Sequence, residues 1–452
     1  MTGGTRRPRP PLSRIAGTRQ QHSTLGIRES DLPTYCCGIA LVLDGAGCKL
    51  LASFMKSISS KTLFLLGVLA VSGGWLAVAQ DKSSPTKSPG GLKFESAVTR
   101  DDLTSVNSVE ISPDGRYLYA TPWALGAVVV FQRETGDGRL THLQTLRDAR
   151  LAGDTGITFS PSGKYAVAAC FNAKTAVLMH CDTNTGQLKI LHSVRQGEDE
   201  VTGLDWPIDA NFSPDGRFVY VLDGNKGGIM IFKVGEDKLE WQKYYTGKEG
   251  CLAGARGATL SPDGKLMYVA GSRANALTVL ERDAEKGGLR VKQILRDGEE
   301  NVEGLAGVFG VTCSPDGEFI YTTSGRFEGD SAVGVFRRES DGKLKLVHEL
   351  IAERDELPGF LGGNRLVLSP GAQQLYAVAS RSGAVACFER DTKTGRIKVQ
   401  EIFTGADGKG ITAGAAGVAI SPDGKYVYIA AEGEATISIY RRTEREKSES
   451  KK

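Results

Sequence analysis

The chain has 452 residues, of which 40% are hydrophobic and 24% are charged, and this composition excludes an intrinsically disordered protein. The formal net charge is +3, but residues 1–80 hold nine of the 56 basic and three of the 53 acidic side chains. The remainder, with 47 basic and 50 acidic side chains, is mildly acidic, so we expect no nucleic-acid-binding surface.

The amino-terminal segment has the order of a secretory signal peptide that starts at an internal methionine. A short basic start, Met55–Lys61, precedes the apolar stretch Leu63–Val71. Ala77–Ala79 then places small residues just before a cleavage point at Gln80. This order predicts that residues 55–80 are a signal peptide.

Cleavage of that peptide predicts an exported protein, periplasmic or extracellular, without a stable membrane span. Residues 1–54 are then a non-native or disordered extension, and the Ser-, Pro- and Lys-rich residues 81–91 are a linker. The alternative is a genuine extension followed by a membrane anchor. Against it, the stretch Leu63–Ala79 is barely long enough to span a bilayer and is interrupted by Ser72–Gly74.

Five cysteines follow the amino-terminal extension: Cys170, Cys181, Cys251, Cys313 and Cys387. They form no C-x-x-C or C-x-x-C-H motif, which excludes a zinc ribbon, a thioredoxin motif and a c-type haem attachment site. Cys170, Cys313 and Cys387 lie in apolar strand patterns and are predicted to be buried small hydrophobic residues. We therefore expect no metal and no cofactor.

Seven internal repeats dominate the rest of the chain. Each contains the motif S-P-x-G or a variant, such as SPDGRYLY, and six of the seven carry a tyrosine seven residues after the serine. Successive serines are 48, 53, 48, 53, 55 and 52 residues apart. The motif serines are Ser112, Ser160, Ser213, Ser261, Ser314, Ser369 and Ser421.

Each repeat is predicted to contain four strands. A short apolar run precedes the serine, S-P-D-G forms a tight turn, and a second strand such as RYLYAT follows. A third strand such as AVVVFQR and a Gly/Asp/Thr turn lead to the fourth, such as LTHLQTL. Seven four-stranded units, rich in glycine turns, predict an all-β, seven-bladed β-propeller.

The two ends of this region complement each other. The seventh repeat stops after its third strand at Arg442, and residues 443–452 are a charged tail. The segment LKFESAV at 92–98 matches the fourth strand LRVKQIL of another repeat. We therefore predict one domain over 92–442, in which strand 92–98 closes the last blade and removes an exposed sheet edge.

The face opposite the S-P-D-G turns is the predicted site face, because its loops vary in length and surround the channel mouth. Several arginines there could converge on an anion; the alternative is solvated loop charges and inter-blade salt bridges. The predicted ligand-binding residues are Arg256, Arg273, Arg326, Arg365, Trp206, Asp209 and Asp223. Further loop candidates are Trp123, Asn172, Lys174, Asn225, Lys226, Asn275, Glu328, Asp330 and Arg381.

The histidines argue against a Ser-His-Asp site. His142, His192 and His348 fall in predicted fourth strands, and His180 ends a third strand. A general base on the site face would have to be a carboxylate. Asp209, Asp223, Glu328 and Asp330 are available, and the sequence selects none of them.

The repeats, for example SPDGRYLYAT…AVVVFQRETGDGRLTHLQTL, resemble the seven-bladed β-propeller lactonase family over about residues 92–442. That family includes bacterial 6-phosphogluconolactonase and carboxymuconate-lactonizing enzymes. Where its enzymes carry a G-P-R-H-like segment, this chain has Gly254–Gly257, which keeps the arginine as Arg256. Trp206–Ile208 keeps only the proline of an H-P-H-like segment, and Ser272 stands where the family tends to have glutamate.

Three functions are compatible with these observations. The first is an exported, non-catalytic propeller that binds a small anionic molecule or an envelope protein at the site face, as a monomer. The second, implied by the resemblance, is a divergent lactonase that holds an anionic lactone with Arg256 and uses a loop carboxylate as base. The third is a quinone- or haem-dependent propeller, for which no attachment motif is present.

Overall fold

The computed structural model describes residues 91–327, 330–354 and 356–443. The predictions for the extension, the signal peptide, the linker up to residue 90 and the end of the charged tail lie outside these residues. Within the described part of the chain, no helix is both long enough and apolar enough to cross a membrane.

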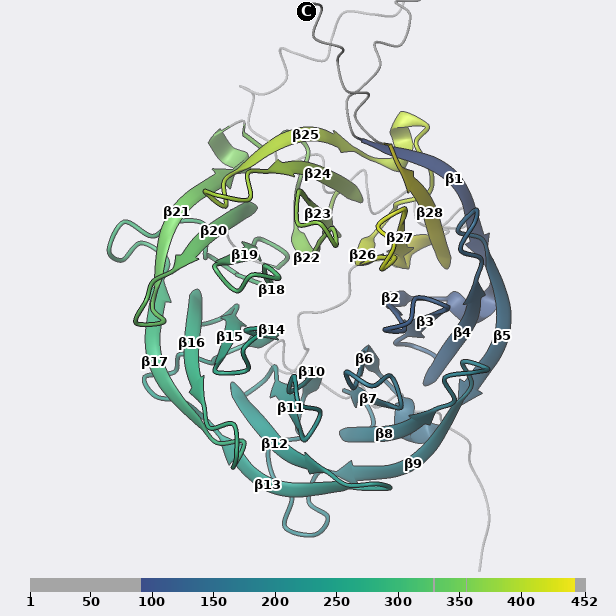
Figure 1. The fold of residues 1–452 in the computed structure, drawn as a ribbon, viewed down its shortest axis with the longest axis vertical. Helices are drawn as coiled ribbons and strands as arrows, with labels where there is room; N and C mark the ends of the chain where they lie inside the picture. The colour runs from purple at the N-terminus through teal and green to yellow at the C-terminus, as the bar shows by residue number, and fades with distance from the viewer. Residues whose placement is uncertain (1–90, 328–329, 355, 444–452) are drawn as a thin grey trace, which may run out of the picture. The chain divides into compact units, whose positions relative to one another are not determined.

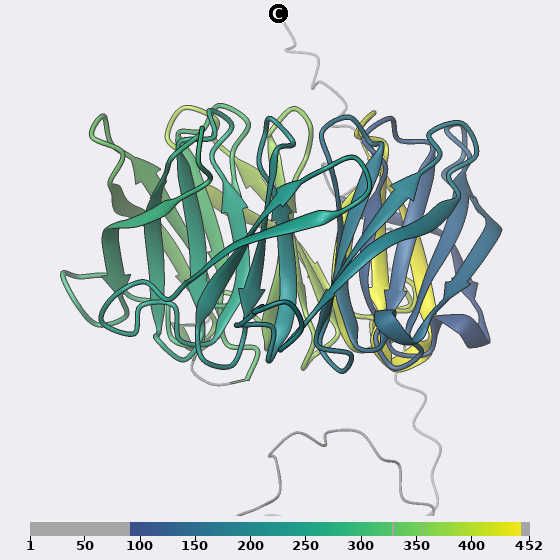
Figure 2. The same ribbon diagram turned by 90° about the horizontal axis from the view of Figure 1, so that it is seen from below.

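The described strands form seven four-stranded antiparallel sheets around a common axis, which confirms the seven-bladed β-propeller (Figure 1). Seen from the side, the sheets stand next to one another as the blades of a flat ring (Figure 2). The innermost strands are β2 (Val106–Ile111), β6 (Asp154–Phe159), β10 (Pro207–Phe212), β14 (Ala255–Leu260), β18 (Gly310–Cys313), β22 (Gly363–Leu368) and β26 (Ala415–Ile420).

The other strands follow outward in each blade. The second strands are β3 (Tyr117–Pro122), β7 (Tyr165–Cys170), β11 (Phe218–Asp223), β15 (Leu266–Gly271), β19 (Phe319–Thr323), β23 (Gln374–Ala379) and β27 (Tyr426–Ala431). The third strands are β4 (Ala127–Arg133), β8 (Thr175–Cys181), β12 (Gly228–Val234), β16 (Ala276–Arg282), β20 (Ala332–Arg338), β24 (Ala384–Arg390) and β28 (Thr436–Arg442).

The outermost strands are β5 (Leu140–Arg147), β9 (Leu188–Arg195), β13 (Leu239–Tyr245), β17 (Leu289–Arg296), β21 (Leu344–Ile351), β25 (Ile397–Phe403) and β1 (Leu92–Thr99). Single 3₁₀ turns lie in the loops: η3 (Asp101–Leu103), η4 (Ala149–Leu151), η5 (Ala352–Arg354), η6 (Gly405–Asp407) and η7 (Glu432–Glu434).

Strand β1 closes the ring as predicted. It pairs antiparallel with β28 from Leu92↔Arg442 to Thr99↔Thr436, with one irregularity between Phe94 and Ser96. Blade 7 therefore takes its outermost strand from the start of the propeller and its other three strands from the end (Figure 1). Strand β28 is thereby paired on both sides, like the third strand of every other blade, so closure leaves no third strand exposed as an edge for association.

The S-P-D-G motif is a structural turn. In blade 3, the Ser213 hydroxyl donates to Asp215 Oδ1 at 2.5 Å and accepts from the backbone N–H of Phe218 at 3.0 Å. Gly216 has φ of 71°, a left-handed conformation that glycine adopts without strain. One serine thus links the two strands through the turn, which explains why the motif recurs in every blade.

In four of the seven blades, the repeated tyrosine hydrogen-bonds to the next blade. Tyr220 of β11 is fully buried and donates from its hydroxyl to the carbonyl of Gly287, in the hairpin turn of blade 4, at 3.0 Å. Tyr119, Tyr321 and Tyr428 make the same bond to glycine carbonyls of the following blade, at 2.9 Å each. The tyrosine is therefore an inter-blade contact in these four blades. Tyr376 instead donates to Gln374 of its own strand, and the buried hydroxyl of Tyr268 makes no hydrogen bond within the described residues.

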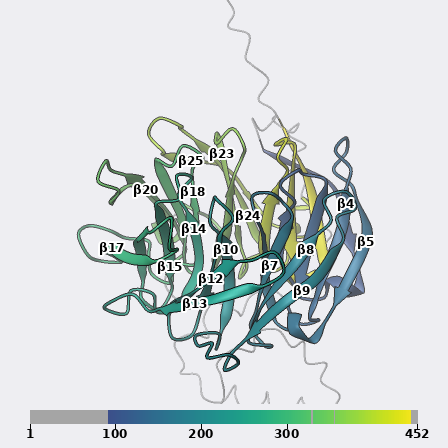
Figure 3. The same ribbon diagram turned by 60° about the horizontal axis from the view of Figure 1, so that its bottom comes forward.

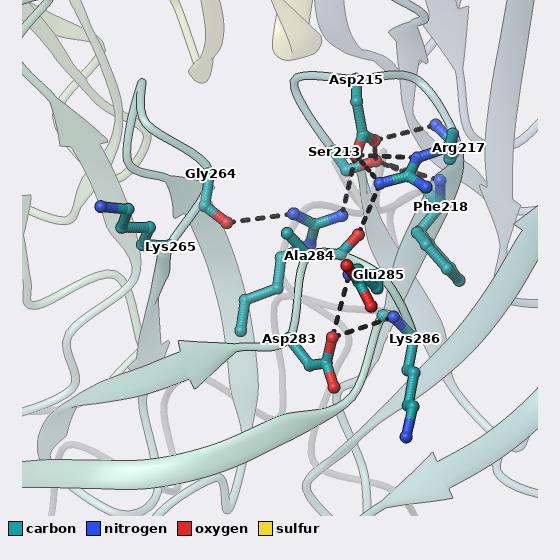
Figure 4. Close-up of polar contacts among 12 residues, drawn as sticks. Ser213, Asp215, Arg217, Phe218, Gly264, Lys265, Asp283, Ala284, Glu285 and Lys286 are labelled. Carbon is teal, nitrogen blue, oxygen red and sulfur yellow. Dashed lines mark hydrogen bonds and ion pairs between the residues drawn. The ribbon is translucent and has the colours of Figure 1, made fainter.

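An arginine at the end of the third strand completes this contact from the opposite direction. Arg282 donates to the Tyr220 hydroxyl at 2.6 Å and to the carbonyl of Gly264 at 3.0 Å, and Nη2 lies 3.5 Å from Asp215 Oδ2. Figure 4 shows the turn that carries Asp215 and Arg217 facing Gly264 and the hairpin turn Asp283–Lys286. We call this arrangement the arginine latch.

The latch recurs at four further interfaces. Its arginine stands 21 residues after the motif serine of its blade, or 24 residues after it in blade 5. Each arginine contacts the preceding blade, and for the first of them that blade is blade 7. The residues are Arg133, which faces Asp423, Arg338, which donates to Asp263, Arg390, which donates to Tyr321, and Arg442, which donates to Tyr376.

Blade 2 departs from the pattern together with blade 3. Val167 replaces the tyrosine of blade 2, and Val234 replaces the arginine of blade 3. Both valines pack in the same apolar cluster. The two members of the latch are thus absent together, and apolar contacts hold this interface instead.

The cysteine prediction holds in part. Cys170 on β7 and Cys387 on β24 are buried, whereas Cys313 on β18 is partly exposed. All five cysteines of the propeller are free thiols.

Candidate functional site

The innermost strands bring two charged side chains together at the axis. Four residues before each motif serine, five blades carry serine or glycine and two carry a charge: Ser108, Gly156, Asp209, Gly257, Gly310, Arg365 and Gly417. Arg365 Nη1 lies 3.9 Å from Asp209 Oδ1, although β22 and β10 belong to blades 6 and 3. In Figures 1 and 3 these blades stand on different sides of the axis.

Small residues give Arg365 room to cross the axis. A Cβ atom on Gly156, in blade 2, would lie 3.4 Å from Arg365 Nη2. The guanidinium therefore extends from blade 6 to the opposite side of the ring. This placement could not be read from the sequence, which predicted loop positions for Arg365 and Asp209; both lie in innermost strands, and so does Arg256.

Asp209 is held in place by its own and the neighbouring blade. Its Oδ2 accepts from the backbone N–H of Ala258 at 3.2 Å and from Asn211 Nδ2 at 3.2 Å. Burial raises the pKa of Asp209 even though Arg365 and these hydrogen bonds act in the opposite direction.

Glu110 on β2 is a second carboxyl at the axis, and it was not among the residues predicted from the sequence. It is accessible to water from the axis and yet enclosed by the ring. This enclosure raises the pKa of Glu110 to about 7; Arg365 lowers it and Asp209 raises it further. Only its position two residues before a motif serine could have identified it.

Arg256 lies among aromatic rings. Its guanidinium carbon is 5.2 Å from the ring centroid of Trp206 and 5.2 Å from that of Phe327, which is within the range of cation–π attraction. Its Nε donates to the Ser272 hydroxyl at 3.4 Å. The side chain is 8% exposed. Three positions quoted from the family resemblance, 206, 256 and 272, are thus in direct contact.

Arg326 joins this group from the loop between β19 and β20. Its guanidinium carbon lies 4.8 Å from the centroid of Phe309 and 5.2 Å from that of Phe327. Its Nη2 is 4.0 Å from Glu432 Oε2. Burial lowers the pKa of Arg326 to about 10; Glu432 opposes this shift, and the nearby Arg365 and Arg256 add to it.

Two more candidate residues border this group. Arg273 Nη2 donates to the carbonyl of Gly224 at 2.9 Å, and its guanidinium carbon lies 5.9 Å from the Trp206 centroid. Trp123 donates from Nε1 to Glu432 Oε1 at 2.9 Å. We refer to Trp206, Arg256, Arg273, Phe309, Arg326, Phe327 and Arg365 as the arginine–aromatic cluster.

Asp223 does not join this cluster. It is fully buried at the end of β11 and accepts from the hydroxyl of Tyr244, on the outermost strand β13, at 2.8 Å. It also accepts from the backbone N–H of Asn225 at 2.8 Å. Burial raises the pKa of Asp223. These contacts give it a role in holding the blade together.

The other loop candidates mostly contact neighbouring loops. Lys226 and Lys174 lie 2.7 and 4.0 Å from Asp205, and Asn275 Oδ1 accepts from the backbone N–H of Gly307 at 2.8 Å. Arg381 donates to the carbonyl of Gly325 at 3.4 Å. Asn172 packs against Gly153, and the Asp330 carbonyl accepts from Ser324. Glu328 lies outside the described residues.

The structure thus brings together Arg256, Arg273, Arg326, Arg365, Trp206 and Asp209 and leaves Asp223 apart. That these residues bind a ligand stays a prediction. Glu110, Glu432 and the aromatic pair Phe309 and Phe327 also lie here and were not predicted from the sequence. Among the described residues, no group of three or more His, Cys, Asp or Glu side chains could hold a metal ion.

Comparison with known families places this geometry in context. The family described as "Lactonase, 7-bladed beta-propeller" matches residues 91–202 and 207–403, which is more than half of the chain. The chain belongs to the seven-bladed β-propeller lactonase family. The matched ranges include Arg256, Ser272 and Arg365 of this lactonase-family propeller. Trp206 lies immediately before the second range.

Curated relatives of this lactonase-family propeller include two 6-phosphogluconolactonases. The Klebsiella pneumoniae (strain 342) protein is 26% identical over 204 residues, which are 45% of this chain and 61% of that protein. The Bacillus subtilis (strain 168) protein is 25% identical over 193 residues, 42% of this chain and 51% of that protein. The alignments therefore span between half and two thirds of these relatives.

Solved structures show the same fold. The periplasmic gluconolactonase of Pseudomonas aeruginosa matches with a TM-score of 0.55 and 17% identity, over 68% of this chain and 85% of its own. Hydrazine synthase of Kuenenia stuttgartiensis matches with a TM-score of 0.57 and 18% identity, over 76% and 97%. Since proteins of such different names share the fold, function must be argued from the site.

This lactonase-family propeller differs at position 257 from the G-P-R-H-like segment that its family resemblance implies. Gly257 stands where the segment ends in histidine. A Cβ atom there would lie 2.7 Å from the carbonyl oxygen of Phe309, which is too close for any side chain without a backbone shift. The blade 5 backbone thus occupies the space that a histidine at 257 needs.

Proposed function

We propose that the arginine–aromatic cluster binds a small anionic compound carrying a carboxylate or phosphate group. The observation that carries this proposal is the convergence of Arg256, Arg326 and Arg365. These three guanidinium groups are close enough that two of them lower the pKa of the third. Their mutual repulsion in a largely enclosed site is unfavourable, and an anion would offset it.

The composition of the cluster supports a selective site. Arginine presents planar, paired donors that match carboxylate and phosphate oxygens. The rings of Trp206 and Phe327 flank Arg256 and restrict its orientation. Phe327 itself is 44% exposed, so the cluster is reachable from solvent. The primary role we propose is therefore binding, in an exported lactonase-like propeller.

The test is calorimetric titration of the full-length chain with 6-phosphogluconate, which carries both a carboxylate and a phosphate. We expect saturable binding that Arg256→Ala weakens at least roughly tenfold, the loss of one charge-assisted pair. Arg217→Ala is the matched control, because Arg217 is an exposed arginine of the opposite S-P-D-G face. Equal binding by wild type and Arg256→Ala would refute the proposed site.

A second candidate is lactone hydrolysis, favoured by the two carboxyl groups beside Arg365. Glu110, with its pKa of about 7, can exist as a base near neutral pH, whereas an ordinary glutamate would be a much weaker one. In this candidate the arginines hold the anionic lactone, and Glu110 or Asp209 activates the attacking water.

Proton release on 6-phosphogluconolactone and a panel of simple lactones separates the two candidates. Turnover that Glu110→Gln abolishes while 6-phosphogluconate binding persists would establish catalysis. Binding without any turnover would leave the binding role alone. Export, proposed from residues 55–80, is tested separately by locating the protein in cell fractions.

A further inference from the structure

The arginine latch provides an internal template for a second binding site. At the blade 3–4 interface, the carboxylate of Asp215 accepts from Arg217 at 3.0 and 3.1 Å and also lies 3.5 Å from Arg282 (Figure 4). Arg217 in turn donates to the carbonyl of Ala284 at 2.8 Å. Asp215 therefore interacts with two guanidinium groups, the exposed one of Arg217 and the buried one of Arg282.

The blade 1–2 interface repeats every part of this arrangement except the buried arginine. Asp114 accepts from Arg116 at 2.9 Å, and Arg116 donates to the carbonyl of Thr183, as Arg217 does to Ala284. Tyr119 donates to the carbonyl of Gly186 at 2.9 Å, as Tyr220 does to Gly287. At the position of Arg282, 21 residues after the motif serine, stands Cys181.

A cavity lies where the latch arginine is missing from the blade 1–2 interface. It has a volume of about 280 Å³ and lies between blades 1 and 2. Its lining consists of the groups that surround the latch arginine elsewhere: Ser112, Pro113, Asp114, Tyr117, Ser162, Gly163, Cys181 and Thr183. Cys181 is too short to fill it, and its Sγ lies 3.1 Å from the Tyr119 hydroxyl.

The blade 2–3 interface also lacks the latch arginine, but its surroundings have changed with it. There the tyrosine is lost as well, and Val167 and Val234 pack in one apolar cluster. At the blade 1–2 interface the tyrosine, the aspartate and the glycine turn are retained. The polar groups that recognise a guanidinium are therefore kept in the absence of the chain's own guanidinium.

We propose that the cavity between blades 1 and 2 binds the guanidinium group of a small cationic compound. The template identifies the contacts: Asp114 as counter-ion, the Tyr119 hydroxyl and the Gly163 carbonyl as acceptors. Arg282 lies 5.6 Å from the ring centroid of Phe218, and Tyr117 occupies the equivalent position, so its ring faces the cation. Two guanidinium groups then share Asp114, as Arg217 and Arg282 share Asp215.

The charge state of Asp114 suits this role. Burial alone would raise its pKa, but hydrogen bonds from Ser112 and Arg116 outweigh it and hold the pKa of Asp114 below its ordinary value. The carboxylate is thus ionised at neutral pH. A guanidinium is favoured over an ammonium of similar size, because its planar donors address several fixed acceptors at once.

The test uses ethylguanidinium chloride at millimolar concentration, with ethylammonium chloride and sodium chloride as controls for charge and ionic strength. We expect ethylguanidinium alone to raise the Tm of the full-length protein and to bind in calorimetry with a Kd roughly tenfold lower than ethylammonium. Cys181→Arg supplies the missing group, so it should raise the Tm by itself and abolish ethylguanidinium binding.

Asp114→Asn provides a second, independent variant and should weaken ethylguanidinium binding roughly tenfold or more. Asp137→Asn is its matched control, because Asp137 also pairs with an exposed arginine, Arg139, but is not among the residues that line this cavity. An equal response of wild type, Cys181→Arg and Asp114→Asn to ethylguanidinium would overturn the proposal, as would equal binding of the two organic cations.

Discussion

The latch arginine at position 282 should contribute a large part of the stability of the blade 3–4 interface. Its side chain is only 2% exposed and donates to the Tyr220 hydroxyl at 2.6 Å and to the Gly264 carbonyl at 3.0 Å. Hydrogen bonds to charged groups are worth about 1.5–3 kcal/mol each. Their joint loss in Arg282→Met therefore removes about 3–6 kcal/mol of favourable interaction.

Part of that loss is recovered. Removing the guanidinium also removes the cost of burying it, which is of the order of several kcal/mol for a buried ion. Asp215 keeps its bonds to Ser213 and Arg217, so no unpaired buried charge is left. The methionine retains most of the apolar stem. The net expectation is a destabilisation of about 2–3 kcal/mol.

Urea unfolding followed by circular dichroism, with thermal melts alongside, measures this difference. For a ring of this size we expect a fall in Tm of about 3–6 °C. Arg217→Met is the matched control: Arg217 binds the same aspartate, but its side chain is 54% exposed, and surface pairs of this kind contribute about 0–1 kcal/mol. If Arg282→Met is destabilised no more than Arg217→Met, the latch is not a stabilising contact.

Three further predictions concern the axis, position 257 and the ring closure. Folding raises the pKa of Glu110 from its ordinary 4.5 to about 7, so the folded state binds the proton more tightly and Glu110 makes the protein less stable as pH rises through this window. Glu110→Gln should therefore gain stability over wild type between pH 4.5 and 7 and keep the gain above; a pH-independent difference in urea midpoints would contradict this. Gly257→Ala should destabilise by about 1–3 kcal/mol, because the new Cβ meets a backbone oxygen, whereas Gly136→Ala, with open space around it, should be close to neutral in the same melts. A chain that begins at Arg100 lacks β1 and should aggregate in size-exclusion chromatography, whereas a chain that begins at Gly91 should stay monomeric. If the chain that begins at Arg100 is monomeric and has an unchanged Tm, closure by β1 is not required for a stable propeller.

The fold could be predicted because its determinants are local and repeated. Ser213, Pro214 and Gly216 act within a single turn, and seven copies at regular spacing imply seven blades. The match of strand 92–98 to a fourth strand was sufficient to predict closure. The tyrosine was visible as a repeat, but its partner lies in another blade, so its function required the structure.

The site could be predicted only in part, because its residues also meet partners from other blades. The structure places several of the predicted arginines near one another, but the sequence does not say which side chains face the axis. Arg365 and Asp209 meet because their blades lie across the ring from each other. Asp223 was predicted from the same kind of position. Its carboxylate instead accepts a hydrogen bond from Tyr244 on the outermost strand β13.

Closure by β1 also has a consequence for the order in which the propeller can form. Thr99 and Thr436, whose hydroxyls are 2.8 Å apart, are separated by 337 positions along the chain. Contacts between such distant segments form slowly, because the entropy of closing the intervening loop is lost before the contact stabilises the chain. During synthesis β1 is made first and its partner last. The propeller therefore becomes complete only when translation of the domain has ended, and until then β1 is a strand without its partner.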